Sequence, residues 1–96
     1  MGGIMRVLKR STLLMNAKDN VASTLEPLAA GTVVPVEHDE LPEPYQITVI
    51  QDIPLAHKFA LRAIGKGDKV IKFGMVIGKA TAEIQQGEHV SEHNLE

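Results

Sequence analysis

The chain has 96 residues, of which 44% are hydrophobic and 23% are charged, so its composition is that of one ordinary globular domain and excludes a disordered segment. Nucleic acid is not an expected partner, because only 3% of the residues are aromatic and the formal net charge is −2, whereas binding to phosphates and bases needs clustered cations and stacking rings. The chain has no cysteine, which excludes a disulfide framework and a thiolate metal site.

Residues 1–15 are interpreted as an N-terminal strand or tail, and residues 16–95 as a single domain. Residues 6–14 have the β-branched and leucine content of a first strand. The apolar stretch at 13–15 is too short for a signal peptide, whose apolar core spans about 7–15 residues, and no run approaches the ~20 residues of a membrane helix. We therefore expect a cytoplasmic protein.

Two short elements are predicted next. Residues 16–20 contain two asparagines and an aspartate, whose side chains bond neighbouring backbone amides and favour a turn. Residues 21–25 predict a short strand or a single helical turn, which ends before Pro27.

A seven-residue pattern then occurs three times: an apolar anchor, two small or polar residues, a glycine, two further residues and a valine. Its copies are residues 28–34, 64–70 and 84–90. Each copy predicts a turn in which the glycine takes a positive φ, followed by a strand that begins near the β-branched residue. The unequal spacing of the copies argues against a solenoid.

An acidic, proline-containing loop is predicted at 37–44, and a strand at 45–51. In that strand Tyr45, Ile47 and Val49 share one face, as in a half-buried strand. No amphipathic pattern persists for the ~11–12 residues of an average helix. The expected fold is mainly β, with short strands, glycine turns and one or two short helical turns.

The C-terminal residues 89–93 match the zinc-peptidase pattern H-x-x-E-H, which requires a long helix to bring both histidines to one metal. In an extended strand, at about 3.3 Å per residue, His89 and His93 would lie about 13 Å apart, too far to share an ion. We therefore interpret His89 as a half-exposed strand residue. The His93–Asn94 pair suits a contact with something outside the domain.

A second pair that could take part in binding or catalysis is His57–Lys58, which follows a proline turn and precedes an apolar run. An imidazole beside an ammonium group can bind a carboxylate or move a proton near neutral pH. The alternative is a surface pair that flanks a core strand, and the residues by themselves favour neither. A basic stretch around the second copy of the pattern is typical of a solvated face.

Four stretches carry a resemblance to a known family: residues 19–22, 56–61, 67–74 and 77–82, together with His93–Asn94. In order and spacing they resemble the small N-terminal domain of the altronate and galactarate dehydratase family. That domain is of the SAF type with a β-clip fold. The resemblance runs from about residue 16 to residue 95.

The resemblance implies a lyase that dehydrates sugar acids. In the family a base removes the proton beside the carboxylate, a divalent metal, commonly iron, stabilises the enediolate, and a neighbouring hydroxyl leaves with help from an acid. Most of this machinery belongs to a large second domain. The resemblance implies that in the related sulfolactate sulfo-lyase the small and large parts are two separate polypeptides. The chain is therefore expected to be a small subunit or an N-terminal domain, with the divalent metal in its large partner and no cofactor bound by the chain alone.

The same resemblance implies the site residues. His57 and His93 would be catalytic, Lys58, Lys72 and Asn94 would bind the sugar-acid or sulfo-acid substrate, and none would ligate a metal. The chain departs from the family pattern at two positions, with Ala56 in place of a glycine and Ser91 in place of a histidine. A non-catalytic sugar-acid-binding or regulatory module of the same fold is the alternative function.

Overall fold

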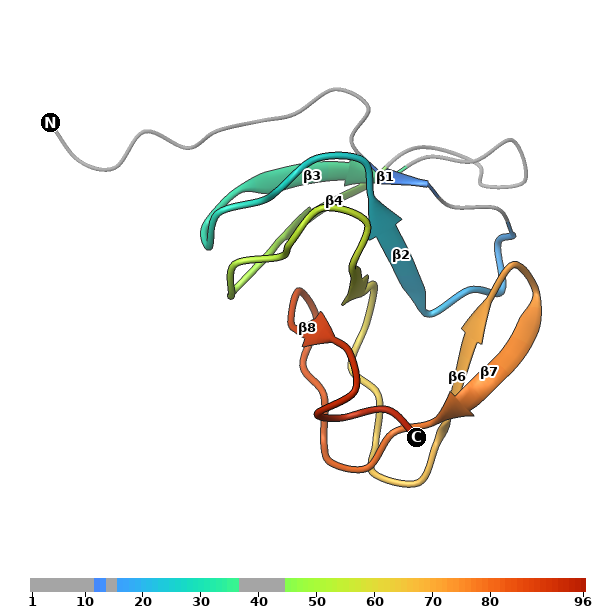
Figure 1. Ribbon diagram of the computed structural model, residues 1–96. Coiled ribbons are helices and arrows are strands. Elements are labelled where there is room, and N and C mark those ends of the chain that lie inside the picture. Colours follow the sequence, from blue (N-terminus) through green and yellow to red (C-terminus); the bar gives the residue numbers. More distant parts are fainter. Residues whose placement is uncertain (1–11, 14–15, 37–44) are drawn as a thin grey trace, which may run out of the picture.

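The computed structural model describes residues 12–13, 16–36 and 45–96 (Figure 1). These residues form eight strands: β1 (Thr12–Leu13), β2 (Val21–Thr24), β3 (Val33–Val36), β4 (Tyr45–Thr48), β5 (Lys58–Ala60), β6 (Lys69–Lys72), β7 (Met75–Lys79) and β8 (His89–Val90). No helix occurs in the described part of the chain, so the mainly β fold is confirmed and the expected helical turns are absent from it.

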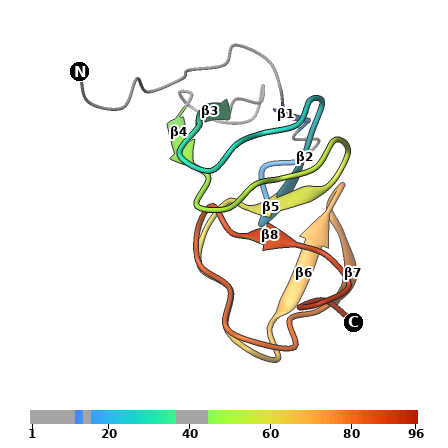
Figure 2. The same ribbon diagram turned by 60° about the vertical axis from the view of Figure 1, so that its left-hand side comes forward.

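The strands form one central sheet and two hairpins. The sheet has the order β1-β2-β5-β8 with antiparallel pairing throughout, and β3–β4 and β6–β7 form separate two-stranded sheets. Figures 1 and 2 show the hairpin β3–β4 on one side of the sheet and β6–β7 on the other. The central strands β2, β5 and β8 are therefore shared by two lobes.

Each lobe has its own hydrophobic core, because the two faces of the central sheet are both apolar. Ala22 and Phe59 are paired across β2 and β5 and face the first core, whereas Val21 and Ala60 face the second. This division follows from the alternation of side chains along a strand. The first core also contains Leu28, Val34, Val36, Ile47, Val49, Ile53 and Leu61, and the second contains Ile64, Val70, Ala80, Ile84 and Val90.

The three predicted glycine turns are confirmed, and each glycine has a positive φ: 92° at Gly31, 89° at Gly67 and 84° at Gly87. A fourth copy of the turn, at residues 53–59, was missed because Ala56 occupies the glycine position. Its φ is 68°, a conformation that a residue with a Cβ rarely adopts. In all four turns the residue after the positive-φ position donates its backbone N–H to the carbonyl three residues before it, at 2.9–3.0 Å, for example His57 to Pro54, as in a type II turn.

The four turns associate in two pairs. The anchors Leu28 and Ile53 exchange two backbone hydrogen bonds, and Ile64 and Ile84 do the same. The positive-φ residue of each turn also donates its backbone N–H to a carbonyl of the paired turn's chain, four residues before the anchor of that turn. For example, Ala56 donates to the carbonyl of Thr24, four residues before Leu28, at 3.1 Å. The two lobes therefore repeat one arrangement of paired turns.

Residues 19–20 connect β2 to the β6–β7 hairpin. The Asp19 carboxylate accepts hydrogen bonds from the backbone N–H groups of Phe73 (2.9 Å) and Gly74 (2.7 Å) at the hairpin tip. The Asn20 side chain accepts from Ile71 N–H at 2.7 Å and donates to the Lys69 carbonyl at 2.9 Å. The predicted turn cluster is thus a clamp that holds a hairpin about fifty residues away in the sequence.

β2 is a strand and not a helical turn. The strand predicted at 45–51 is shorter than expected, because β4 ends at Thr48. Ile47 and Val49 are buried as predicted, whereas Tyr45, predicted on the same face, is exposed. The predicted loop at 37–44 and most of the predicted N-terminal strand lie outside the described residues.

We expect Ala56→Gly to stabilise the domain. The left-handed conformation costs a residue with a Cβ about 1–2 kcal/mol, whereas the extra freedom of glycine in the unfolded chain costs about 0.4–1 kcal/mol. The free energy of unfolding should therefore rise by about 0.5–1 kcal/mol, measured by equilibrium unfolding in urea.

Gly31→Ala is the matched control, because a Cβ at Gly31 meets no atom within 4 Å and only the backbone conformation opposes it. This change should lower the free energy of unfolding by a similar amount. If both substitutions lowered the free energy of unfolding, the assignment of Ala56 as a strained turn residue would be contradicted.

Candidate functional site

The candidate site contains a contact between the side chains of His57, which directly precedes β5, and His89, in β8. His57 Nδ1 lies 2.9 Å from His89 Nε2, and the ring centroids are 5.1 Å apart. In the β5–β8 ladder Phe59 is opposite His89, so His57, two residues before Phe59, is the diagonal neighbour of His89 on the same face. Diagonal neighbours are within reach of ring side chains, which explains how residues 32 positions apart make this contact.

His93 joins this pair because the chain turns after β8. The strand covers only residues 89–90, and residues 91–93 form a turn. The rings of His89 and His93 therefore have centroids 5.3 Å apart. The extended spacing of about 13 Å expected for these two residues is wrong.

Asn94 closes the turn and does not face outward. Its side chain accepts a hydrogen bond from the Ser91 N–H and donates to the His89 carbonyl, both at 2.9 Å, and only 2% of its surface is exposed. The expectation that Asn94 contacts something outside the domain is therefore wrong for this conformation. Its bonds hold His93 near His89, and its role in substrate binding stays a prediction.

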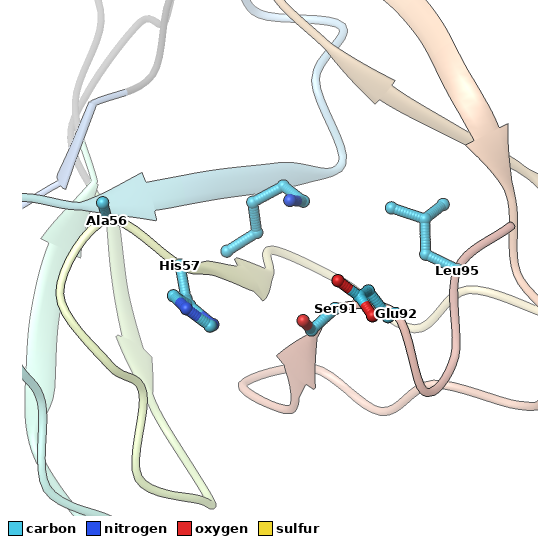
Figure 3. Close-up of a pocket in the computed structure, with 6 residues that line it drawn as sticks. Ala56, His57, Ser91, Glu92 and Leu95 are labelled. Carbon is cyan, nitrogen blue, oxygen red and sulfur yellow. The ribbon is translucent and has the colours of Figure 1, made fainter.

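An open cleft of about 370 Å³ lies beside the histidine pair. Figure 3 shows His57 on one side of it and, on the other, Ser91 and Glu92 from the turn after β8. Its lining is Ala56, His57, Lys58, Ser91, Glu92 and Leu95. The cleft therefore contains two of the five predicted site residues, His57 and Lys58.

Lys72, at the end of β6, is linked electrostatically to this cleft. Burial and the nearby Lys58 ammonium group lower the pKa of Lys72, and Asp19 opposes them with a smaller effect. The Lys72 Nζ lies 4.7 Å from the centroid of the Phe73 ring, in the geometry of a cation–π contact. Two like charges held near one another favour the binding of an anion between or beside them.

His57 differs from the residues at the same position in the other three turns. The side chains of Thr32, Asp68 and Glu88 each make a hydrogen bond to the backbone of the residue three positions earlier in the same turn. The His57 ring instead turns to His89. The fourth turn has thus lost a local side-chain bond, and its histidine serves a contact between strands.

The structure does not assign a metal to these histidines. In the described ranges no group of three or more histidine, cysteine, aspartate or glutamate side chains is arranged to hold a metal ion. The close contact between His57 Nδ1 and His89 Nε2 engages both nitrogens with each other. This contact leaves neither of these two nitrogens free to ligate a metal ion.

His89 is the site residue that the sequence analysis missed. The interpretation as a half-exposed strand residue is confirmed for its place in β8, but its contact with His57 was not foreseen. The signal was the fourth turn copy, since the turns at 53–59 and 84–90 lead into β5 and β8, the strands that pair. Recognising Ala56 as a turn position would have placed each histidine at the start of a strand that follows such a turn, whereas the pairing of the two strands is a property of the tertiary structure.

Comparison with known proteins identifies the family. Over residues 10–96 the chain matches the altronate/galactarate dehydratase SAF domain, and it belongs to that family. The suspected resemblance is confirmed, as is the mainly β domain that it implied.

Two kinds of relative are similar to the chain. It is 46% identical over 80 residues to altronate dehydratase of Escherichia coli (strain K12), an alignment that covers 83% of the chain and 15% of that protein. It is 44% identical over 50 residues to (2R)-sulfolactate sulfo-lyase subunit alpha of Paracoccus pantotrophus, covering 52% of the chain and 75% of the subunit. The chain thus spans a small part of the dehydratase and most of the alpha subunit.

Among the residues that the structure describes, no helix is long and apolar enough to cross a membrane.

We expect the stability of the domain to fall when the pH drops below the usual histidine pKa of 6.5. Burial, followed by the charges of His57, His93 and Lys58, lowers the pKa of His89. Below pH 6.5 the unfolded chain therefore binds more protons than the folded one, so the free energy of unfolding rises with pH through this window and is lost as the pH falls.

Urea unfolding at about pH 7.5 and about pH 5.5 measures this difference. The same measurement on His89→Gln is the control, because this variant lacks the imidazole of His89 and keeps the other titratable groups. A loss of stability that is as large in His89→Gln as in the wild type would contradict the assignment to His89.

Proposed function

We propose that this chain is the small subunit or N-terminal domain of a hydro-lyase that acts on sugar acids of the altronate or galactarate type. In this proposal it supplies substrate-binding residues to an active site that it shares with a large partner chain. The observation that carries the proposal is the cleft at His57 and Lys58, approached by the charge of Lys72, in a member of this family.

The charges of the cleft suit an acid substrate. Lys58 lines the cleft, and Lys72 is close enough for the two ammonium groups to repel each other. A substrate carboxylate would relieve this repulsion and accept charge-assisted hydrogen bonds from both lysines. Lys58 and Lys72 are therefore proposed to bind the carboxylate.

His57 is proposed to transfer a proton at the same site. It lies beside Lys58 at the cleft, and an imidazole can accept and donate a proton through its ring nitrogens. His93, whose ring lies beside that of His89 and which is exposed, is proposed to contact the substrate as well. These roles rest on placement and residue chemistry.

A shared active site accounts for the openness of the cleft. Its volume, about 370 Å³, is near the lower end of the ~300–1,000 Å³ of typical ligand sites, and a sugar acid bound there would stay largely exposed. The partner would supply the remaining walls. The divalent metal that the family resemblance implies, expected to be iron, is likewise proposed to lie in the partner.

The β6–β7 hairpin is the surface that we propose for docking to this partner. Four apolar side chains of the hairpin are exposed: Phe73 (46%), Met75 (68%), Val76 (54%) and Ile77 (41%). Phe73 also has a φ of 57°, a strained conformation for a bulky residue. Exposed apolar side chains grouped on one hairpin are typical of an interaction site.

Charge favours the large chain over a second copy as the occupant. Residues 69–79 contain three lysines and no acidic residue, so two hairpins packed together would repel each other. A partner with an apolar patch and an acidic rim would complement this surface. The length of the E. coli dehydratase, of which the aligned region is 15%, is consistent with such a large partner.

The function is tested by mixing the chain with the large polypeptide encoded beside it and assaying elimination from altronate, galactarate and sulfolactate. We expect a complex and turnover that needs both chains. Lys58→Met and Lys72→Met should each raise KM about 10- to 100-fold, because each removes a charge-assisted hydrogen bond.

Lys66→Met is the matched control, since Lys66 is an exposed lysine outside the cleft, and its KM should not change. The absence of both complex and stimulated turnover would contradict the proposal. A non-catalytic module would instead bind sugar acids by itself and show no effect of His57 or His93 on turnover.

The docking surface is tested by Val76→Asp. A carboxylate on the apolar hairpin should weaken the complex with the large chain by about 10-fold or more, measured by titration calorimetry. Leu25→Asp is the control, because Leu25 is equally exposed, at 55%, but lies outside the hairpin.

Unchanged affinity in Val76→Asp would contradict this surface. Self-association of the wild-type chain that Val76→Asp abolishes would show that a second copy covers the hairpin, and would overturn the assignment to the large chain.

A further inference from the structure

The contact between His57 and His89 constrains where protons can lie. A hydrogen bond between Nδ1 of His57 and Nε2 of His89, at 2.9 Å, needs one nitrogen to donate and the other to accept. If His57 is charged, both of its nitrogens carry protons, so His89 must then accept with an unprotonated Nε2. Only a neutral His89 allows this state.

We propose that His89 is a positioning residue that accepts a hydrogen bond from His57 Nδ1–H and thereby presents Nε2 of His57 to the cleft as the atom that takes up and releases the proton. In the same way, the aspartate of a Ser-His-Asp triad accepts a hydrogen bond from Nδ1–H of the histidine base and holds it in one tautomer. This inference rests on the proposed function for its catalytic meaning, but the tautomer itself does not.

Several features hold His89 in the accepting role. Its backbone N–H donates to the Gln51 side chain at 2.9 Å, and its carbonyl accepts from the Asn94 side chain at 2.9 Å, so both ends of the residue are fixed. The positive charge of Lys58 and the rings of His57 and His93 oppose protonation of His89, as does its burial. A neutral His89 can therefore orient His57 without holding the proton.

The surrounding acidic groups do not replace His89 in this role. Glu88 precedes His89, and its carboxylate bonds the Gln85 N–H and the Asn94 side chain. Glu92 lines the cleft on the side opposite His57 (Figure 3). The side-chain hydrogen bond that the structure gives to the His57 ring is the one from Nδ1 to His89, which leaves Nε2 for the substrate.

The tautomer is measured by ¹⁵N NMR of the imidazole nitrogens in the chain alone, at a pH above the titration of its histidines. We expect His57 to be protonated at Nδ1 in the wild type, although free histidine favours Nε2–H. In His89→Leu the new side chain has a similar size but cannot accept a hydrogen bond, so His57 should change to Nε2–H.

His93→Ala is the control for this measurement, because His93 stacks on His89 and makes no hydrogen bond to His57 in the described structure. It should leave the His57 tautomer unchanged. Nε2–H as the main tautomer of His57 in the wild type, or no change in folded His89→Leu, would overturn the proposal. If His89→Leu does not fold, His89→Ala is used in the same way.

Turnover with the large chain separates positioning from mere folding. His89→Leu should lower kcat about 10- to 100-fold with little change in KM and alter the acid limb of the pH profile. His89→Gln, whose amide oxygen can accept from Nδ1–H, should restore part of kcat. Equal kcat in His89→Leu and the wild type would overturn the catalytic meaning. The expected tautomer together with no turnover in any complex would contradict the proposed function and leave the positioning intact.

Discussion

Each lobe of the domain depends on the pairing of two turns through the backbone of a residue with positive φ. In such a turn the N–H of that residue points away from its own chain and bonds a residue before the partner's anchor, as Ala56 does with Thr24. The paired anchors then enter the two cores. Because β5 follows a turn of one pair and β8 follows a turn of the other, their antiparallel ladder joins the two lobes. Because the described residues contain no helix, these backbone hydrogen bonds between paired turns hold much of the chain in its fold.

The clamp formed by Asp19 and Asn20 is the second constraint, because it determines where Lys72 lies. A carboxylate that accepts two backbone N–H groups holds the tip of the β6–β7 hairpin, and charge-assisted bonds of this kind are stronger than neutral ones. The clamp permits Phe73 to keep a strained backbone and an exposed ring. It therefore connects Lys72, which we propose to bind the substrate, to the surface proposed for the partner.

Much of the local structure could be predicted from the sequence, because short-range rules govern it. Gly31, Gly67 and Gly87 were recognised as positive-φ turns, and the alternation at Ile47 and Val49 indicated a strand with one buried face. Errors arose where a residue departs from its usual preference. Ala56 has the conformation of a glycine, and Asn94 is buried because its amide satisfies the backbone of the turn after β8.

The sequence by itself determined the turn positions, the mainly β character and the family, since ordered motifs and local backbone preferences are contained in the order of residues. Only the tertiary structure decided which side chains form the site. The contact between His57 and His89 depends on the pairing of β5 with β8, and that of His93 with His89 on a turn closed by Asn94. No local pattern specifies such contacts, because pairing between strands is selected by the burial of two whole cores.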